Sequence, residues 1–346
     1  MVLVENSEHG SRFREENPNL NLPYISFIIP VYNAGDMLQT CLESIFRQDY
    51  PDDKFEVLVI DGGSVDNTVD VAKKFPVRLI HNPERRADHG NFLGVKSAKG
   101  KYIVILAADN EIPSEDWLRK LTKPVIEHPD LAGVIPLPIS SPMDPPINVY
   151  YTLLKTDPLT FFVFDSFGNL FNVYKPMKKC GEYLVYRFPK DRCPLIGLAQ
   201  GFMVRRELVP DSINFDDTAP FCEMAAKGYK FAVTLGVGVY HYHLKSLRHF
   251  VRKYIFRSRT RSKLTVVKRP LIFTKRRRVR MIAWFVYSLS LIWPALDSIK
   301  GYKNSGSKSW FYHPIACLLI TLIDVMHAVT HPKDAYSVLR WVDLLQ

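Results

Sequence analysis

The chain has 346 residues, 47% of them hydrophobic, and a net charge of +11. That length accommodates one large domain or two modest ones around a substantial core. Its five cysteines are scattered and never spaced as C-x-x-C, which disfavours a disulfide framework or a zinc site. The first 22 residues are polar and lack an apolar run, so we predict no cleaved secretory signal and a folded domain that faces the cytoplasm.

The segment from Tyr24 to about Leu137 alternates between short apolar runs and amphipathic stretches. The apolar runs predict strands over Tyr24–Val31, Phe55–Ile60, Val77–His81 and Tyr102–Ala107. The stretches between and after them predict a helix that Asp36 caps and that runs to about Gln48, and further helices after Asp66-Asn67 and over Gly90–Lys99. A last helix is predicted over Glu115–His128, with Ser114 as its cap. Such alternation is typical of right-handed crossovers and of an α/β fold whose mainly parallel sheet is covered by helices.

The pattern changes between residues 136 and 195, where the sequence is rich in proline and aromatic residues. We predict an irregular insertion there that borders a ligand site. Regular structure is expected to return afterwards, with strands over Leu198–Arg205, Phe231–Thr234 and Val237–His243 and a helix over Phe221–Lys227 that ends at Gly228.

The positive charge is concentrated between Arg248 and Arg280, where 14 Lys or Arg residues occur without an Asp or Glu. A basic amphipathic helix is predicted from Ser246 to about Lys263. A solvated face is one interpretation, but the apolar segments that follow favour anionic lipid as the partner. Nucleic acid is disfavoured because aromatic residues are not interleaved as stacking platforms.

Two apolar stretches, Met281–Leu296 and Pro314–Val329, close the chain. The first has about 16 residues, fewer than the ~20 of a spanning helix. Each stretch fits a tilted span, a re-entrant hairpin, an interfacial helix, or a buried helix of a soluble domain. We favour membrane attachment because the basic cluster Lys275–Arg280 precedes the first stretch as a cytoplasmic flank would. The expected division is a polar tail (1–22), an α/β domain (23–245), a basic interface segment (246–280) and apolar helices (281–346).

Polar residues follow three of the predicted strands: Pro30–Asn33, Asp61–Asp66 and Ala108–Glu111. Ligands of an open parallel sheet bind at the carboxyl ends of its strands. The carboxylates, amides and glycine turn at these positions suit a ligand that carries ribose and phosphate. Asp109 and Glu111 offer the oxygen ligands that Mg²⁺ or Mn²⁺ prefers. Each motif alone is more typical of a turn, but their combination at one edge favours a site.

Four motifs in the same order resemble those of family 2 glycosyltransferases. Ile28–Asn33 is similar to the family's first strand, and Val59–Thr68 to its V-D-D-G-S-T-D-x-T turn. Gly94–Ile103 is similar to its G-I-x-x-A-x-G-x-Y-I stretch, and Phe215-Asp216-Asp217 followed by Lys227–Lys230 to its E-D … A-G-Y-K block. The resemblance covers about residues 24–243. It implies a GT-A fold and an enzyme that uses a nucleotide-sugar, a UDP- or GDP-sugar, as donor.

The resemblance also implies roles for individual residues. The donor would be bound by Pro30, Tyr32, Asn33, Asp61, Gly63, Ser64 and Asp109. The divalent cation, Mg²⁺ or Mn²⁺, would be held by Asp109, with Glu111 and His243 as further ligands. His241 and His243 alternate along a predicted strand and therefore project to the same face. Two departures stand out: Gly62 replaces the second aspartate of the turn, and Ala107 the first aspartate of D-x-D.

Asp217 matches the family's catalytic base, which implies inverting transfer to an acceptor hydroxyl. The acceptor side would include Asp216, Gln200, Arg205 and Arg206. A processive synthase would carry Q-x-x-R-W, and this chain has only Arg340-Trp341, so we predict single addition. The acceptor is expected to be lipid-linked or a growing glycan, because the basic helix adjoins the apolar segments.

Other functions fit the motifs less well. The turn Pro30–Asp36 lacks the glycine-rich loop that a nucleotidyltransferase or a dinucleotide-dependent oxidoreductase needs. The remaining alternative is a non-catalytic nucleotide-binding or membrane-surface scaffold protein, in which Gly62 and Ala107 mark a decayed transferase site.

Overall fold

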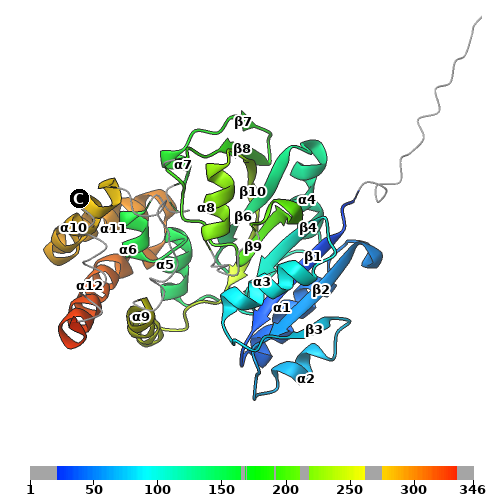
Figure 1. Cartoon of the computed structure of the whole chain (residues 1–346). Coiled ribbons are helices and arrows are strands. Elements are labelled where there is room, and N and C mark those ends of the chain that lie inside the picture. The colour runs from blue at the N-terminus through cyan, green and yellow to red at the C-terminus, as the bar shows by residue number, and fades with distance from the viewer. Residues whose placement is uncertain are drawn as a thin grey trace, which may run out of the picture.

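A computed structural model describes residues 22–332, except 165–167, 169, 191, 211–217 and 262–274 (Figure 1). Asp216 and Asp217, the end of the predicted basic helix and the last residues of the chain therefore lie outside the described residues.

One central sheet forms the frame of the molecule, in the strand order β3-β2-β1-β4-β9-β6-β10-β8-β7, with β5 paired to β10. The strands are β1 (Ile25–Val31), β2 (Phe55–Asp61), β3 (Arg78–His81), β4 (Tyr102–Leu106), β5 (Asn110–Glu111), β6 (Leu131–Ile139), β7 (Lys178–Lys179), β8 (Tyr183–Arg187), β9 (Gln200–Arg205) and β10 (Lys230–His241). Strands β1, β2, β3, β4, β6 and β10 run in one direction, and β9 runs against its neighbours β4 and β6. The prediction of a mainly parallel sheet flanked by helices is confirmed.

Helices cover both faces of this sheet. One face packs against α1 (Gly35–Phe46), α2 (Thr68–Ala72) and α4 (Trp117–Glu127), and the other against α3 (Ala87–Ser97), α7 (Leu170–Val173) and α8 (Ala219–Ala226). Strand β1 is apolar except for Ser26 because it serves both cores: Phe27 and Ile29 enter the first, and Ile28 enters the second. Short 3₁₀ turns lie at Asp52–Lys54, Arg206–Leu208 and Lys308–Tyr312.

Two predicted helix caps are wrong. Helix α1 begins at Gly35, so Asp36 lies inside its first turn and not before it. Helix α4 begins at Trp117, and the Ser114 hydroxyl donates to the Asp116 carboxylate at 2.8 Å without capping the helix. A carboxylate in the first turn still interacts favourably with the helix dipole, which is the role left to Asp36.

The insertion between residues 136 and 195 is more regular than predicted. It contains α5 (Pro146–Leu154) and α6 (Pro158–Val163), followed by α7, β7 and β8. Pro146 and Pro158 stand at the first positions of their helices, where the missing N–H costs no hydrogen bond. Asp157 caps α6 by accepting the Thr160 N–H at 2.9 Å. The prolines therefore start helices here and do not break them.

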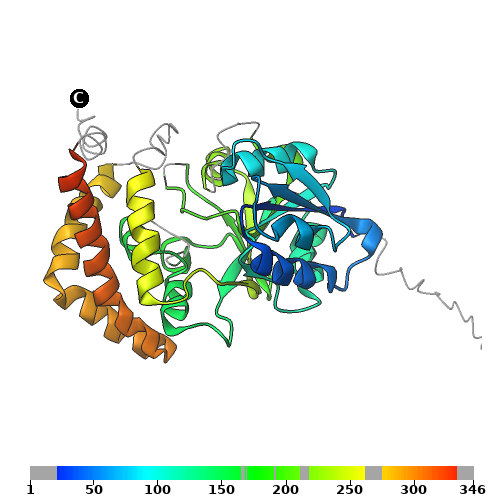
Figure 2. The ribbon, with the colours of Figure 1, turned by 90° about the horizontal axis from the view of Figure 1, so that it is seen from below.

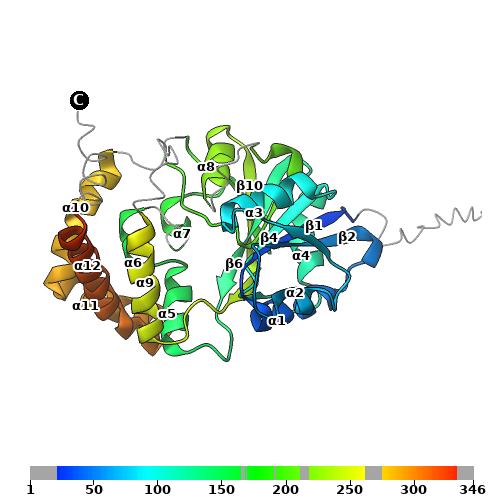
Figure 3. The ribbon, with the colours of Figure 1, turned by 60° about the horizontal axis from the view of Figure 1, so that its bottom comes forward.

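The helical layer, as we call α5, α6 and the four C-terminal helices together, has a core of its own beside the sheet (Figures 2 and 3). The C-terminal helices are α9 (Leu247–Arg261), α10 (Lys275–Ser290), α11 (Ile292–Ser305) and α12 (His313–Thr330). Tyr150 from α5, Trp284 from α10 and Ile320 from α12 are buried together in this core. The insertion and the chain's C-terminal part, far apart in sequence, thus form one packing unit.

The first predicted apolar stretch is not one straight helix. Leu291 has a positive φ of 55° and separates α10 from α11, and the two helices meet at an angle of 86°. Among the described residues, one segment, Lys308–Thr330, is by itself long and apolar enough to cross a membrane, and the bent pair passes the same test if taken together.

Gly94 is required where α3 packs against β1. A Cβ atom there would lie 2.3 Å from Cγ2 of Ile28, a buried β-branched side chain without room to move. We expect Gly94→Ala to lower the free energy of unfolding by about 1–3 kcal/mol through overpacking, measured by chemical denaturation. Gly236→Ala is the control, because a Cβ atom at Gly236 meets nothing within 4 Å. Equal stability of the two variants would contradict this packing.

Candidate active site

The carboxyl ends of β1, β2, β4 and β10 meet at one edge of the sheet, since these strands run in the same direction. Asp61 ends β2, Asp109 follows β4, and His241 ends β10. Residues that are far apart in the sequence are therefore brought to the same edge, as the rim positions predicted.

Asp61 is built into the turn that follows β2. Its carboxylate accepts the N–H groups of Gly63 and Ser64, each at 3.1 Å, and the Ser64 hydroxyl at 2.6 Å. Asn33, with a left-handed φ of 50°, ties the neighbouring turn to this one by donating its N–H to the Ser64 hydroxyl and accepting the Val65 N–H, both at 2.9 Å. The two turns form one preorganised rim.

Gly63 and Gly62 shape this rim in different ways. Gly63 has a φ of 79°, which favours glycine and explains why the motif keeps it. At Gly62 a Cβ atom would lie 3.2 Å from Cα of Arg85 and 3.3 Å from the Val31 carbonyl oxygen. The segment around Arg85 thus leaves little space for the aspartate that the family pattern has there. The Arg85 guanidinium lies over the exposed Tyr32 ring, 5.9 Å from its centroid.

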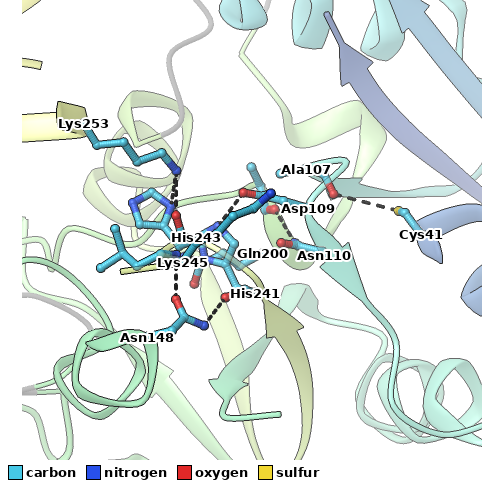
Figure 4. Close-up of polar contacts among 12 residues, drawn as sticks. Cys41, Ala107, Asp109, Asn110, Asn148, Gln200, His241, His243, Lys245 and Lys253 are labelled. Atoms are coloured by element: carbon cyan, nitrogen blue, oxygen red, sulfur yellow. Dashed lines mark hydrogen bonds and ion pairs between the residues drawn. The ribbon is translucent and has the colours of Figure 1, made fainter. Parts of the chain in front are cut away.

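A cluster of three potential metal ligands occupies the centre of this edge (Figure 4). One ligand atom from each of Asp109, His241 and His243 lies within 4.8 Å of the others. Nε2 of His241 is 3.5 Å from Oδ2 of Asp109, and the rings of His241 and His243 are 4.8 Å apart between centroids. We call these three residues the Asp–His–His cluster. One carboxylate and two imidazoles form a donor set that binds a divalent ion.

The backbone around the cluster is held by hydrogen bonds from several elements. Tyr242 donates its N–H to the Asp109 carbonyl oxygen at 2.9 Å, which joins the end of β10 to the loop after β4. Asn148 on α5, fully buried, donates to the His241 carbonyl oxygen at 2.8 Å and accepts the Leu244 N–H at 2.9 Å. The insertion helix therefore fixes the path of the segment that carries both histidines.

The electrostatics of the cluster favour an ionised carboxylate beside a neutral imidazole. Burial alone would raise the pKa of Asp109, but the hydrogen bond and charge of His241, with those of His243 and Lys253, hold it well below its usual range. Burial, followed by the charges of His241 and Lys253, lowers the pKa of His243 well below its ordinary value. An ionised carboxylate and an imidazole with a free lone pair are the forms that bind metal.

Glu111 lies outside the Asp–His–His cluster. Its carboxylate accepts the Tyr242 hydroxyl at 2.6 Å and lies 3.5 Å from the Arg47 guanidinium. In the pairing of β5 with β10, Glu111 lies opposite Tyr240, and Asn110 lies opposite His241. The Glu111 side chain therefore contacts Tyr242 and Arg47 and not His241. Among the described residues Asp109 groups with His241 and His243, so Glu111 as a metal ligand in place of the aspartate missing at Ala107 stays a prediction that this geometry does not favour.

The predicted acceptor-side residues of β9 lie at opposite edges of the sheet. Because β9 is antiparallel to β4, Gln200 at its start lies at the edge of the cluster, with Nε2 3.3 Å from Nδ1 of His241. Arg205 at its end lies opposite Tyr102, at the other edge of the sheet. Arg206 donates to the Gly100 carbonyl oxygen at 3.0 Å on that same edge.

The structure therefore does not bring Arg205 and Arg206, predicted on the acceptor side, to the edge that carries the cluster. The Arg205 guanidinium donates to the carbonyl oxygens of Pro129 and Leu131, and both arginines serve to hold loops at the far edge. Asp216 and Asp217, the predicted acceptor-side acid and catalytic base, belong to the segment outside the described residues.

Comparison with known proteins identifies the part of the fold that carries the rim turns and Asp109. Residues 26–174 match the model of glycosyl transferase family 2. The chain carries a family 2 glycosyltransferase domain. The matched segment includes the rim turns and Asp109, and the remainder of the Asp–His–His cluster follows it in the sequence.

Two curated relatives are similar to part of this chain. A dolichyl N-acetyl-alpha-D-glucosaminyl phosphate 3-beta-D-2,3-diacetamido-2,3-dideoxy-beta-D-glucuronosyltransferase of Methanococcus voltae is 34% identical over 125 residues, which cover 32% of this chain and 38% of that protein. Glycosyltransferase AglE of Haloferax volcanii is 34% identical over 105 residues, which cover 29% of this chain and 34% of that protein. The chain thus spans little more than a third of these relatives.

A solved structure matches nearly the whole chain. A mannosyltransferase from Pyrobaculum calidifontis, determined in complex with GDP-Man and Mn²⁺, superimposes with a TM-score of 0.53 over 88% of this chain and 87% of that one, at 18% identity. At this identity the similarity concerns the fold, and it bears out the predicted GT-A type architecture.

The sequence did not reveal that α9 contributes a side chain to this site. Lys253 extends from α9 toward His243, and its ammonium group donates to the His243 carbonyl oxygen at 2.9 Å (Figure 4). In the sequence Lys253 is one of many basic residues between Arg248 and Arg280. No local pattern distinguishes it from neighbours that face the solvent, since its role follows from how the helical layer docks on the sheet.

Proposed function

We propose that this protein transfers a sugar from a nucleotide-sugar to a lipid-linked acceptor, at an active site centred on the Asp–His–His cluster. The observation that carries the proposal is this cluster, placed at the carboxyl edge of a family 2 glycosyltransferase domain. Ligands of open α/β sheets bind at that edge, and a diphosphate requires a cation there.

A divalent cation is proposed at the cluster because its residues fit one. The Asp109 carboxylate and the imidazoles of His241 and His243 lie within 4.8 Å of one another. Two nitrogen ligands favour a transition ion such as Mn²⁺ over Mg²⁺, which prefers oxygen. The Pyrobaculum mannosyltransferase with its bound GDP-Man and Mn²⁺ supports this choice. When bound, the ion supplies positive charge to the leaving diphosphate.

The remaining chemistry is assigned to residues of this chain. The rim formed by Asp61, Ser64 and Asn33 would bind the nucleoside part of a UDP- or GDP-sugar. The acceptor hydroxyl oxygen would form a bond to the anomeric carbon while the bond to the diphosphate oxygen breaks, which inverts the anomeric configuration. The hydroxyl proton would pass to Asp217, as the family resemblance implies.

The acceptor is proposed to be lipid-linked because the helical layer offers a surface suited to a membrane. Helices α10 and α11 expose large apolar side chains on both sides of their bend: Val279, Ile282, Val286, Leu289, Ile292, Trp293 and Leu296. The first turns of α10 add basic residues, of which Arg276 is exposed and Arg280 is half-buried. Apolar side chains flanked by basic ones are typical of helices that lie in the membrane interface. The relative of Methanococcus voltae, named for a dolichyl phosphate-linked acceptor, supports this choice.

We propose an interfacial attachment, with the catalytic domain on the cytoplasmic side. The bend at Leu291 divides the apolar stretch into helices of 16 and 14 residues, each shorter than the ~20 residues of a spanning helix. The basic cluster at the start of α10 is expected on the cytoplasmic side of a membrane.

The double variant Ile292→Asp/Trp293→Asp is expected to bind anionic lipid vesicles at least about tenfold more weakly than the wild type, as measured by co-sedimentation. The two side chains are 68% and 60% exposed at the bend, where they would enter the acyl boundary. Leu235→Asp is the matched control, because Leu235 is exposed on β10, within the sheet and not in the helical layer. Equal loss in both variants would contradict the proposed surface.

The proposed function is tested by incubating the purified protein with a panel of UDP- and GDP-sugars in the presence of Mn²⁺ and detergent. Release of nucleoside diphosphate from one member, increased by a polyprenyl-phosphate-linked acceptor, is the expected result. No release from any donor, with nucleotide binding retained, would favour the non-catalytic scaffold, to which the departures at Gly62 and Ala107 point.

A further inference from the structure

Lys253 is the basic side chain of α9 that reaches the Asp–His–His cluster from the helical layer. Its ammonium nitrogen lies 3.2 Å from Nδ1 of His243 and 2.9 Å from the His243 carbonyl oxygen. Its charge acts on Asp109, and it is itself held partly buried among Lys245, Arg257 and His243. The ring of His243 is fixed from its other side by Tyr151, which stacks on it with 4.6 Å between the ring centroids.

The contact between Lys253 and His243 is incompatible with a cation on the same imidazole. An ammonium group only donates hydrogen bonds, so Nδ1 must present its lone pair to Lys253, and Nε2 then carries the proton. A metal bound through Nε2 needs the opposite tautomer, and a metal bound through Nδ1 takes the lone pair that Lys253 uses. Lys253 must therefore leave the imidazole of His243 when the cation binds, while its hydrogen bond to the His243 carbonyl oxygen can persist.

The released ammonium group stays close to the cluster because α9 is anchored. Asp157, at the start of α6, accepts hydrogen bonds from Tyr254 at 2.9 Å and Arg257 at 3.1 Å, both on α9. Lys253 belongs to α9 of the helical layer and reaches the cluster at His243 (Figure 4). A cation arriving with a diphosphate brings negative phosphate oxygens to this position, and they are the natural partner of the freed ammonium group.

We infer that Lys253 is a phosphate ligand of the active site, which exchanges His243 for a phosphate oxygen when the cation and its substrate bind. This inference rests on the proposed function, and it names a residue outside the segment that matches the family model. The phosphate has two sources: the leaving diphosphate of the donor and the phosphate of a polyprenyl acceptor.

The test compares Lys253→Met with the wild type in three binding measurements. Mn²⁺ alone, followed by electron paramagnetic resonance, is expected to bind Lys253→Met at least as tightly, because a competing cation has been removed from His243. Affinity for UDP or GDP with Mn²⁺, or for a short polyprenyl phosphate in detergent, is expected to fall about 10- to 100-fold, the range of a charge-assisted hydrogen bond. The nucleotide and the polyprenyl arms identify which phosphate is bound.

Opposite changes in metal and phosphate affinity separate this role from a structural one, since a misplaced His243 would weaken both. Arg252→Met is the matched control: it removes the same charge from the preceding position of α9, where the side chain faces the solvent. Lys253→Arg keeps the positive charge and is expected to bind phosphate nearly as tightly as the wild type. If Lys253→Met is poorly folded, Lys253→Arg replaces it as the variant that is measured.

Three results would overturn the inference: unchanged phosphate affinity in Lys253→Met, an equal loss in Arg252→Met, or weaker binding of Mn²⁺ together with phosphate. A wild-type protein that binds no nucleoside diphosphate would overturn the proposed function as well, so the two failures are distinguishable.

Discussion

Replacement of Asp109 by alanine is expected to reduce sugar transfer by at least about 1,000-fold, which corresponds to ~4 kcal/mol of lost transition-state stabilisation. Asp109 supplies the carboxylate of the Asp–His–His cluster, and the two histidines that remain give no negative charge to hold a cation. The same variant is expected to lose Mn²⁺ binding, measured by electron paramagnetic resonance, with nucleoside diphosphate release as the assay of activity.

Glu111→Gln provides the comparison for this prediction. The carboxylate two residues further along is engaged by Tyr242 and Arg47, so its neutralisation is expected to leave Mn²⁺ binding in place. If Glu111→Gln lost Mn²⁺ binding and Asp109→Ala kept it, Glu111 and not Asp109 would be the carboxylate ligand of the metal.

Asp157→Ala is expected to lower the free energy of unfolding by about 3 kcal/mol. The Asp157 side chain is only 2% exposed and joins two helices: it caps α6 at Thr160 and accepts hydrogen bonds from Tyr254 and Arg257 of α9. Its removal costs a cap, a buried hydrogen bond and an ion pair. The value stays at the lower end for buried pairs because the Arg257 side chain is 52% exposed and regains water.

The measurement is chemical denaturation followed by circular dichroism, with Asp130→Ala as control. Asp130 pairs with Lys230 at 2.6 Å, but its side chain is 56% exposed, so a loss below about 1 kcal/mol is expected. Similar losses in the two variants would show that Asp157 does not join the helices as described.

The contribution of Asp157 should also depend on pH. Burial alone would raise its pKa, but Arg257 and the hydrogen bonds from Thr160 and Tyr254 outweigh burial and lower it. Since the folded-state pKa lies below the unfolded value of ~3.9, the stabilisation is complete above about pH 4. It is lost as the pH falls through the folded-state pKa, so wild type and Asp157→Ala should converge in stability under strongly acidic conditions.

The parts of the site that follow from local pattern were predictable. Asp61 and Asp109 each end a buried apolar run, and parallel strands bring such positions to one edge. His241 and His243 come close together, as the alternation along the predicted strand implied, although β10 ends at His241 and the His243 N–H donates to the His241 carbonyl oxygen at 2.8 Å. These inferences need only the period of the sequence and the direction of the strands.

The parts that failed depend on contacts between distant elements. The antiparallel direction of β9 puts Arg205 at the far edge while Gln200 reaches the cluster, and nothing within the strand's own sequence records that direction. Glu111 accepts a hydrogen bond from Tyr242, which lies 131 positions later in the chain, and it is not part of the Asp–His–His cluster. The same limit applies to the proline-rich insertion, whose helices are stabilised by the C-terminal helices they pack against.

Helix α5 has a consequence for how this protein can be divided in the laboratory. Its Asn148 and Tyr151 hold the histidine segment, while Ile147, Tyr150 and Leu154 are buried in the helical layer. A fragment that stops at residue 245 would lack the C-terminal helices, so Ile147, Tyr150 and Leu154 of α5 would be exposed to water. The sheet and the helical layer therefore form a single cooperative unit, and a fragment that stops at residue 245 is expected to lose the fixed positions of His241 and His243.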